Sequence, residues 1–210
     1  MTSSSPEPRK TRKELLSEWR HNEVLHAARH IFGRLGYAAA NVEDIAKEAG
    51  MAKGTVYLYF KSKEEVFAAV LALDLERLTQ ETIDGMSAAE SFVDRMTVFL
   101  NLRLAYLRNN RDFMRVYVAE FGSRGSGSTV IFEVKHRYIQ RGIEFMRQCL
   151  ERAIARDEIR TVPVEAAAYA IYDIARGYVE RHLIGSTQLD PEEDLAFTHS
   201  LIVNGLQKHD

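Results

Sequence analysis

Apolar residues recur at helical spacing along almost the whole chain, with apolar positions three and four apart. The alternation of apolar and polar residues that is typical of half-buried strands is absent. The prolines are Pro6, Pro8, Pro163 and Pro191, so none interrupts residues 9–162 and long helices are permitted there. The pattern predicts an all-α protein with about nine helices, at 18–35, 42–49, 53–59, 62–83, 88–109, 111–121, 129–156, 164–185 and 191–207.

Two helix starts carry capping residues. Ser62 precedes a helical run whose third residue is Glu65, which predicts a capping box. Asp190 precedes another run, with Pro191 at its first position. The segment Gly122–Ser128 (GSRGSGS) predicts a flexible loop, and it lacks the Gly-Lys-Ser/Thr ending of a phosphate-binding loop.

The two short expected helices on either side of Gly50 have the spacing of a helix-turn-helix. Ile45 and Ala46 on the first face Val56 and Phe60 on the second. A small residue lets the helices approach closely, glycine makes the bend, and a branched apolar residue locks the second helix in place. In this motif the second helix enters the major groove of DNA with its N-terminus first.

Side chains suited to DNA surround this second helix. Lysine can bind guanine, threonine and tyrosine can contact phosphate, and glycine lets the backbone approach the duplex. An asparagine can cap the N-terminus of the first of the two helices, whose free backbone N–H groups then attract phosphate. The candidate DNA-binding residues are Asn41, Ala52, Lys53, Gly54, Thr55, Tyr57, Tyr59, Lys61 and Lys63. The alternative is that the tyrosines are half-buried packing residues and the lysines are only solvated.

The segment Gly36–Phe67 (GYAAANVEDIAKEAGMAKGTVYLYFKSKEEVF) resembles the DNA-binding domain of the TetR family of transcriptional regulators. Its Gly-Tyr, Asp-Ile-Ala, Ala-Gly, Lys-Gly-Thr-Val-Tyr and Tyr-Phe-Lys-Ser-Lys-Glu runs follow in the family's order. The resemblance implies DNA contacts from Lys53, Thr55, Tyr57, Tyr59 and Lys63. The family often has two hydroxyl residues where this chain has Ala40 and Asn41, so position 40 offers no phosphate contact and Asn41 must supply the cap.

The last two expected helices carry apolar stripes. Residues 156–185 resemble the family's penultimate helix, and in such regulators the last two helices pair with their copies in a dimer. The candidate dimer residues are Ala167, Ile171, Ile174 and Tyr178 on one helix and Leu195, Ile202 and Leu206 on the other. Periodicity alone favours the alternative, an internal core.

The middle helices carry many methionine and aromatic residues, which can line an adaptable cavity. The helix at 88–109 is apolar around much of its circumference, which predicts central burial. The candidate effector-binding residues are Phe92, Met96, Phe99, Arg103, Tyr106, Tyr117, Phe121, His136, Ile139 and Ile143. The alternative is simply a packed helical core.

Arg103 shares a stripe of this helix with large apolar side chains. A buried guanidinium is costly unless a partner pairs with it. We expect an internal carboxylate such as Glu120 or Asp173 to be that partner. The alternative is an acidic group on an effector with an aromatic or long apolar body, held by the planar guanidinium fork.

Composition is ordinary for a globular protein, with 46% hydrophobic and 28% charged residues and a net charge of -2. The single cysteine, Cys149, cannot form an internal disulfide, which favours the reducing cytoplasm. The longest apolar run, residues 66–73, is too short for a membrane span of about 20 residues. Basic residues at 9, 10, 12 and 13 cluster in an expected flexible tail, either solvated or a phosphate-neutralising arm.

An enzyme is the rival class, and the sequence gives it little support. There is no HExxH pair, no Cys/His cluster with zinc spacing and no nucleophile constellation, so we expect no metal and no cofactor. His26 and His30 lie four apart on one expected helix, but no acidic partner is evident.

The sequence therefore predicts a DNA-binding transcriptional regulator. Residues 1–65 form an N-terminal arm and a three-helix DNA-binding domain, and residues 66–210 form a larger helical bundle for effector binding and dimerisation. We expect a homodimer on a near-palindromic operator in double-stranded DNA, acting as a repressor that a small apolar effector releases. The alternatives are a regulator without an effector and a helical enzyme.

Overall fold

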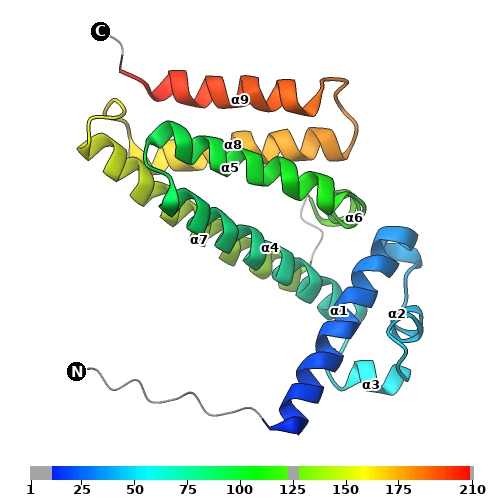
Figure 1. Cartoon of the computed structure of the whole chain (residues 1–210). Coiled ribbons are helices and arrows are strands. Elements are labelled where there is room, and N and C mark those ends of the chain that lie inside the picture. Colours follow the sequence, from blue (N-terminus) through cyan, green and yellow to red (C-terminus); the bar gives the residue numbers. More distant parts are fainter. Residues whose placement is uncertain (1–10, 123–127, 209–210) are drawn as a thin grey trace, which may run out of the picture. The chain divides into compact units, whose positions relative to one another are not determined.

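The computed structural model describes residues 11–122 and 128–208, and their regular secondary structure is entirely α-helical. The predicted all-α fold is confirmed. The helices are α1 (Arg12–Ala39), α2 (Val42–Glu48), α3 (Lys53–Tyr57), α4 (Lys63–Ala88), α5 (Phe92–Asn109), α6 (Arg111–Phe121), α7 (Thr129–Ala155), α8 (Val164–Leu183) and α9 (Pro191–Leu206) (Figure 1). None of them is both long enough and apolar enough to cross a membrane.

The first helix begins earlier than the pattern predicted. The side chain of Thr11 accepts the N–H of Glu14 at 3.3 Å, and the Glu14 carboxylate accepts the N–H of Thr11 at 2.7 Å. This capping box starts α1 at Arg12 rather than at residue 18. Arg12 and Lys13 therefore lie in a helix, and the prediction that they belong to a flexible tail is wrong. Positions 9 and 10, and most of the predicted loop (123–127), lie outside the described residues.

The start of α4 only partly matches the predicted capping box. The Ser62 hydroxyl accepts the N–H of Glu65 at 3.1 Å, as expected. The Glu65 carboxylate, however, accepts the N–H of Lys61 at 2.7 Å, one residue before the expected donor. The helix also continues to Ala88, beyond the predicted end at 83, because apolar and helix-favouring residues persist through this stretch.

The chain divides into two compact units, Met1–Val70 and Leu71–Asp210. The first contains α1, α2, α3 and the first turns of α4. The fully buried side chains of its core are Val24, Ala28, Phe32, Ile45, Val56, Val66 and Phe67. The rings of Phe32 and Phe67 meet edge to face with centroids 5.0 Å apart, which joins α1 to α4.

Two glycines with positive φ set the direction of the chain in this unit. Gly36 (φ 78°) interrupts the helical geometry of α1, and Gly50 (φ 63°) turns the chain between α2 and α3. Residues that carry a side chain rarely adopt this conformation. Ala46 and Val56, on either side of the Gly50 turn, are buried. The predicted helix-turn-helix is therefore confirmed.

The second unit contains the rest of α4 and helices α5 to α9. Its central helix is α5, which packs against α6, α7, α8 and α9 (Figure 1). Phe92, Met96, Phe99 and Leu100 of α5 are at most 2% exposed. The predicted central burial of this helix is confirmed.

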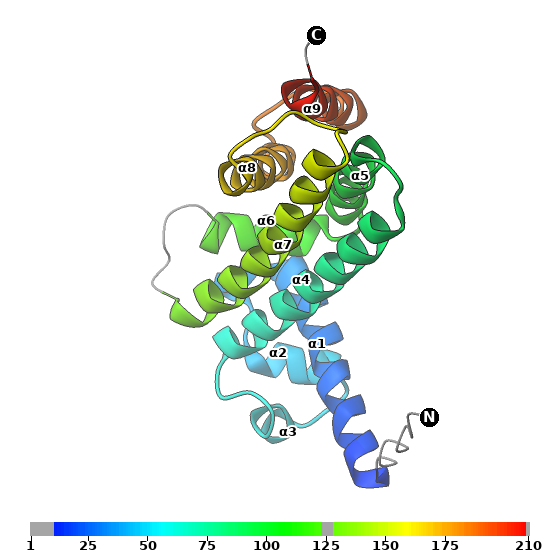
Figure 2. The same ribbon diagram turned by 90° about the vertical axis from the view of Figure 1, so that its left-hand side faces the viewer.

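Helix α7 runs beside α4 and packs closely on α8 (Figure 2). Arg141 of α7 donates to Glu76 and Gln80 of α4, at 2.7 Å each. The next residue, Gly142, permits the approach of α8, because a Cβ at this position would lie only 2.1 Å from the Tyr172 hydroxyl oxygen. Helices α4 to α8 together surround one cavity.

The last helix starts at Asp190, as predicted. The Asp190 carboxylate accepts the N–H groups of the second and third residues of α9, at 2.9 and 3.1 Å. Further along α9, the buried Asp194 accepts two hydrogen bonds from the Arg181 guanidinium, at 2.7 and 2.8 Å, and contacts His182 Nε2 at 2.8 Å. The hydrogen bonds from Arg181 hold the pKa of the Asp194 carboxyl below its ordinary value.

Candidate functional site

The short helix α3 presents one face to solvent. Val56 is fully buried and anchors the helix in the core of the first unit. Lys53, Gly54 and the half-exposed Tyr57 lie on the outer side. No Cβ-sized obstacle surrounds Gly54 within 4 Å, so the backbone here is accessible to a flat or grooved partner. This is the arrangement that a recognition helix needs.

The N-terminus of α2 lies beside α3. Asn41 accepts the N–H of Asp44 at 2.9 Å, which confirms the cap predicted from the sequence. Lys53 Nζ of α3 lies 3.3 Å from a carboxylate oxygen of Glu43, and both side chains are well exposed. An exposed ion pair of this kind contributes about 0–1 kcal/mol, so it leaves Lys53 available to another anion.

Several predicted DNA-binding residues surround one surface hollow in the first unit. They are Asn41, Lys53, Tyr57, Lys61 and Lys63. Glu43, Asp44 and Lys47 line the same hollow. Ala52, Gly54 and Thr55 lie outside it. Tyr59 also lies outside, and its ring meets the His21 ring of α1 edge to face at 6.1 Å. For Tyr59 the packing alternative is the one that matches the structure.

Lys63 has an internal role that the motif did not predict. Its ammonium donates to the carbonyl oxygens of Tyr37 (2.7 Å), Ala38 (3.3 Å) and Ala40 (2.9 Å) at the end of α1. It also lies 4.5 Å from the centroid of the Tyr37 ring. An ammonium has three N–H donors, so all of them find acceptors within the first unit. A phosphate contact from Lys63 stays a prediction.

His30 does have an acidic partner, contrary to the sequence expectation. Its Nδ1 lies 2.6 Å from a carboxylate oxygen of Glu48 in α2. Among the residues that the structure describes, no group of three or more His, Cys, Asp or Glu side chains could hold a metal ion. The contact between His30 and Glu48 joins α1 to α2.

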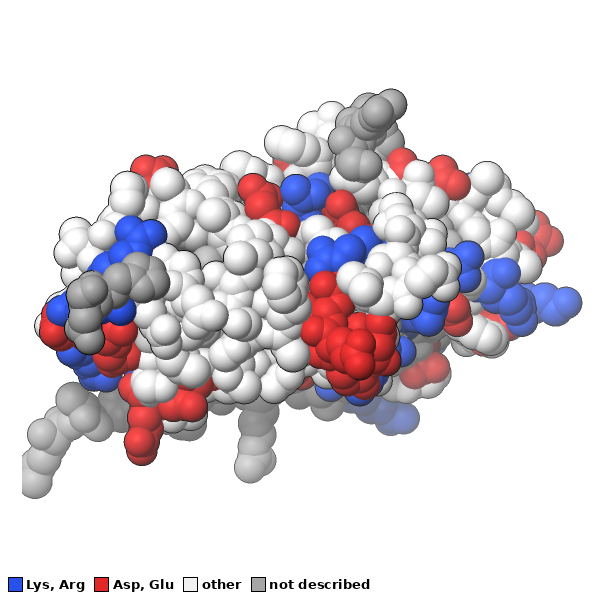
Figure 3. Space-filling view, turned by 90° about the horizontal axis from the view of Figure 1, so that it is seen from above, with Lys and Arg blue, Asp and Glu red and all other residues white. Residues whose placement is uncertain are grey.

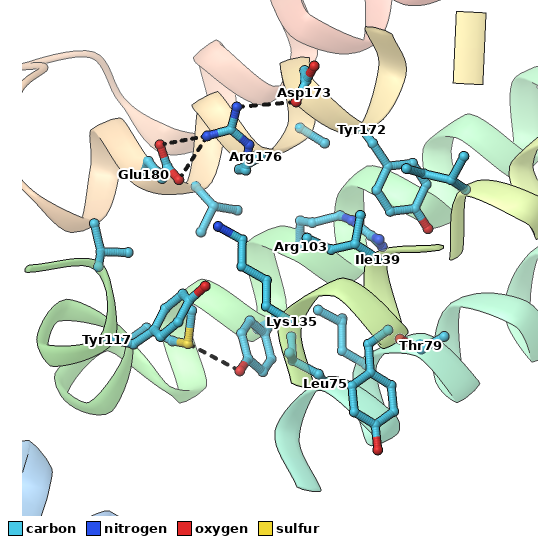
Figure 4. A pocket seen from close by; sticks show the side chains of 18 of the residues that line it. Leu75, Thr79, Arg103, Tyr117, Lys135, Ile139, Tyr172, Asp173, Arg176 and Glu180 are labelled. Atoms are coloured by element: carbon cyan, nitrogen blue, oxygen red, sulfur yellow. Dashed lines mark hydrogen bonds and ion pairs between the residues drawn. The ribbon is translucent and has the colours of Figure 1, made fainter. Parts of the chain in front are cut away.

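The cavity of the second unit has a volume of about 270 Å³ and is lined by side chains from α4 to α8 (Figure 4). Of the predicted effector-binding residues, Arg103, Tyr106, Tyr117, Ile139 and Ile143 line it. Phe92, Met96, Phe99, Phe121 and His136 do not line it. The first three are core residues, while His136 is exposed and stacks on Phe132 outside.

Other lining residues escaped the sequence reasoning. Leu75 and Leu78 come from α4, Lys135 from α7, and Tyr172 and Arg176 from α8. The spacing of Tyr172, Arg176 and Val179 is helical, so a stripe was visible in the sequence. It lies beside the stripe of Ile171 that was assigned to the dimer, and periodicity alone does not show which stripe faces a cavity.

Arg103 is buried in the wall of this cavity. Its Nη1 donates to the Thr82 hydroxyl at 2.9 Å and to the Phe99 carbonyl at 3.1 Å. The guanidinium carbon lies 3.6 Å from the centroid of the Phe99 ring and 5.6 Å from that of Tyr172. Burial lowers the pKa of Arg103, and the Tyr172 hydroxyl opposes that change.

The carboxylate partner expected for Arg103 is not the one that the structure provides. Asp173 lies 3.2 Å from Arg176, which also lies 3.1 Å from Glu180. Glu120 is exposed and does not line the cavity. The hydrogen bonds of Arg103 go to neutral acceptors instead.

Lys135 contributes a second cation to the cavity wall. Its ammonium donates to the Gly122 carbonyl at 3.3 Å and points toward the ion-paired Arg176 and Glu180 (Figure 4). Burial lowers the pKa of Lys135, and the charge of Arg176 lowers it further. Burial also raises the pKa of Tyr117, another residue of the wall, to about 12. The wall is thus apolar and aromatic, with a few fixed charges.

The residues predicted to form a dimer interface belong mainly to the core. Ile171, Tyr178, Leu195, Ile202 and Leu206 are at most 9% exposed, and they pack among α5, α8 and α9. Ala167 and Ile174 are half-buried. A side chain buried in its own unit has little surface left for a second copy, so burial favours the internal-core alternative for these five residues. A dimer contact from Ala167 or Ile174 stays a prediction.

Helix α9 also carries exposed apolar side chains, on the side that faces away from the buried Leu195, Ile202 and Leu206. Phe197 is 67% exposed and Leu201 is 53% exposed. Seen from above, the face that carries α9 shows a broad area without charged side chains (Figure 3). Large apolar residues that are exposed together often mark a contact site.

Comparison with known proteins agrees with this architecture. Residues 24–70 match the profile of a family described as bacterial regulatory proteins, tetR family. The chain is 30% identical to the HTH-type transcriptional regulator UidR of Escherichia coli (strain K12) over 139 residues, which cover 65% of this chain and 67% of UidR.

Two solved structures share the fold at lower identity. The transcriptional regulator FadR from Bacillus subtilis, in complex with stearoyl-CoA, superposes with a TM-score of 0.76 at 19% identity over 88% of this chain and 98% of its own. The SmeT–triclosan complex, whose protein is a repressor from Stenotrophomonas maltophilia, gives 0.75 at 21% identity over 90% and 92%. The helix-turn-helix, the all-α second unit and the match to UidR together show that the chain belongs to the TetR family of transcriptional regulators.

Proposed function

We propose that this regulator binds a near-palindromic operator as a homodimer, represses transcription there, and is released when a small apolar molecule fills the cavity of the second unit. In this proposal residues 1–65 read DNA, and residues 66–210 dimerise and bind the effector. The observation that carries it is the helix α3, which is anchored by the buried Val56 and presents Lys53, Gly54 and Tyr57 outward.

The length of α3 supports binding as a dimer. Lys53–Tyr57 is little more than one helical turn and reaches only a few base pairs. Two copies on a two-fold site double the number of base contacts, and each well-formed contact adds about 1–3 kcal/mol of discrimination. We place the interface on the exposed face of α9 around Phe197 and Leu201, which offers uncharged surface.

The cavity supports an effector. Its volume of about 270 Å³ is close to the lower end of small-molecule sites, which span about 300–1,000 Å³. FadR and SmeT, which share the fold, have been solved with stearoyl-CoA and triclosan. Leu75 and Leu78 of α4 line the cavity, and the same helix begins in the first unit at Lys63. An effector that displaces α4 would change DNA affinity, typically by about 1–3 kcal/mol of coupling.

The operator experiment uses a labelled DNA fragment from upstream of the protein's own gene. Fluorescence anisotropy should show salt-sensitive binding that a random fragment competes for weakly, with two chains per site. Lys53→Ala should weaken specific binding more than non-specific binding, because Lys53 lies at the N-terminus of α3. Equal losses on both fragments would contradict the role of Lys53.

The dimer is tested with the double variant Phe197→Glu/Leu201→Glu. Both side chains are exposed, so the fold should survive while charge prevents the faces from meeting. Sedimentation should show a dimer for the unaltered protein and a monomer with weakened operator binding for the variant. A variant that stays dimeric would move the interface elsewhere, and an unaltered protein that is monomeric on DNA would refute the dimer.

A further inference from the structure

We propose that the molecule that fills the cavity is an organic anion with an apolar body, and that its acidic group binds the guanidinium of Arg103. This rests on the proposed function, because it names the chemical class of the effector. The carrying observation is a cation buried in a mostly apolar cavity wall whose hydrogen bonds go to a hydroxyl and a carbonyl oxygen.

A buried guanidinium of this kind is suited to ligand recognition. Removing a cation from water is costly unless an opposite charge pairs with it, and Thr82 and Phe99 supply only neutral acceptors. Both hydrogen bonds start at Nη1, one corner of a planar fork that carries five N–H donors. A carboxylate matches the geometry of such a fork with two parallel hydrogen bonds.

The surrounding structure holds the guanidinium in place. Phe99 lies against it at 3.6 Å, and Tyr172 approaches it from α8. The Phe99 and Tyr172 rings also meet each other edge to face, with centroids 5.2 Å apart. Gly142 of α7 leaves room for Tyr172 in this position, because a Cβ there would collide with the Tyr172 hydroxyl. The cation is therefore fixed before a ligand arrives, which reduces the ordering cost of binding.

The other charges of the wall also favour an anion. Asp173 and Glu180 line the cavity, but Arg176 is ion-paired with both. Lys135 adds positive charge. Aromatic rings in the wall would suit a lipophilic cation. Such a guest, however, would lie near Arg103 and Lys135, and like charges brought together disfavour binding.

Apolar side chains from three helices accommodate the body of the ligand. Leu75 and Leu78 come from α4, Met114 from α6, and Ile139 and Ile143 from α7. Figure 4 shows Ile139 beside Arg103, so apolar wall and cation share one side of the cavity. A flexible or flat apolar molecule of modest size, ending in a carboxylate, matches this combination.

The test measures binding of three ligands that share one tail. Decanoate, decanol and decyltrimethylammonium are titrated calorimetrically into the full-length protein without DNA at neutral pH. Decanoate should bind at least about tenfold more tightly than decanol, since a charge-assisted pair exceeds a neutral contact. Decyltrimethylammonium should bind most weakly. This series uses the unaltered protein, so it decides the question even where a variant fails to fold.

Two variants then assign the preference to one cation. Arg103→Met keeps most of the side-chain volume and should bring decanoate down to the affinity of decanol. Lys135→Met, the matched loss of the other wall cation, should leave most of the preference intact. A thermal unfolding curve of each variant confirms that it is folded.

Several outcomes would overturn the proposal. Decanol binding as tightly as decanoate, a preference for the ammonium, or loss of the preference in Lys135→Met instead of Arg103→Met would each do so. Failure of all three ligands to bind would also overturn it. Because no DNA is present, none of these results bears on operator binding, which the anisotropy experiment judges separately.

Discussion

Replacing Lys63 by methionine separates a structural role from a DNA contact. Lys63→Met keeps the apolar stem and removes the ammonium that donates to three carbonyl oxygens at the end of α1. Hydrogen bonds to a charged group contribute about 1.5–3 kcal/mol. We therefore expect the first unit to lose about 1.5–3 kcal/mol of stability.

The single tryptophan allows this loss of stability to be measured in the first unit itself. Trp19 lies in α1 and is 53% exposed, so about half of it is covered in the folded unit and its fluorescence should change when that unit unfolds. With a urea dependence of about 1–3 kcal/mol per molar, the midpoint should fall by about 1 M. Lys61→Met is the matched control, because Lys61 is exposed and its backbone N–H makes the hydrogen bond to Glu65.

DNA binding of the same two variants completes the test. Each phosphate contact adds about 0.9 to the slope of log affinity against log salt. Lys61→Met should reduce this slope and leave the urea midpoint unchanged. Lys63→Met should lower the midpoint and leave the slope unchanged under conditions where it is folded. A Lys63→Met protein with an unaltered midpoint and a reduced slope would refute our assignment and restore the phosphate contact.

Two further predictions concern the second unit. Gly142→Ala should destabilise the protein by about 1–3 kcal/mol in thermal unfolding, because its Cβ would lie 2.1 Å from the Tyr172 hydroxyl oxygen. Gly177→Ala is the control, since its Cβ would meet only an Arg181 nitrogen at 3.9 Å, and an equal loss there would argue against the collision. Asp194→Asn should cost about 1.5–3 kcal/mol at pH 7, because Arg181 holds the pKa of this carboxyl below its ordinary 3.8. The stability that the ionised carboxylate contributes is present above pH 3.8 and is lost as the pH falls through the lowered pKa of Asp194. In urea unfolding, the difference in stability between the unaltered protein and Asp194→Asn should therefore shrink at low pH. A difference that stays constant would contradict the ion pair.

The helices and the helix-turn-helix were predictable because their signals are local. Apolar periodicity, the cap at Asp190 and the turn at Gly50 each act within a few residues of the chain, and the structure uses all of them. The early start of α1 was also readable, since Thr11 is followed three residues later by Glu14. This capping box was not predicted because it lies in a polar stretch of the sequence, where apolar periodicity does not mark a helix.

The partners of the functional side chains were not predictable, because they come from distant parts of the chain. Lys63 bonds to carbonyl oxygens 23 to 26 residues away, and Arg103 bonds to Thr82 on another helix. Periodicity shows which residues share a face, but it does not show what that face packs against. For this reason Ile171 and Tyr178, which were assigned to a dimer interface, are buried in the core, while the neighbouring Tyr172 lines the cavity.

The boundary between the two units lies inside a helix rather than in a linker. It falls between Val70 and Leu71, both almost completely buried, within the continuous helix α4. Domains that proteases release and that recombination exchanges are usually joined by exposed, flexible segments. Here the boundary is neither exposed nor flexible. A cut between Val70 and Leu71 would divide α4, whose turns contribute to both cores. A chimaeric regulator can be joined either before or after α4, and in both cases one of the two cores receives a foreign helix. Transplanting the DNA-binding unit therefore requires redesign of the half of α4 that packs in the core of the other protein.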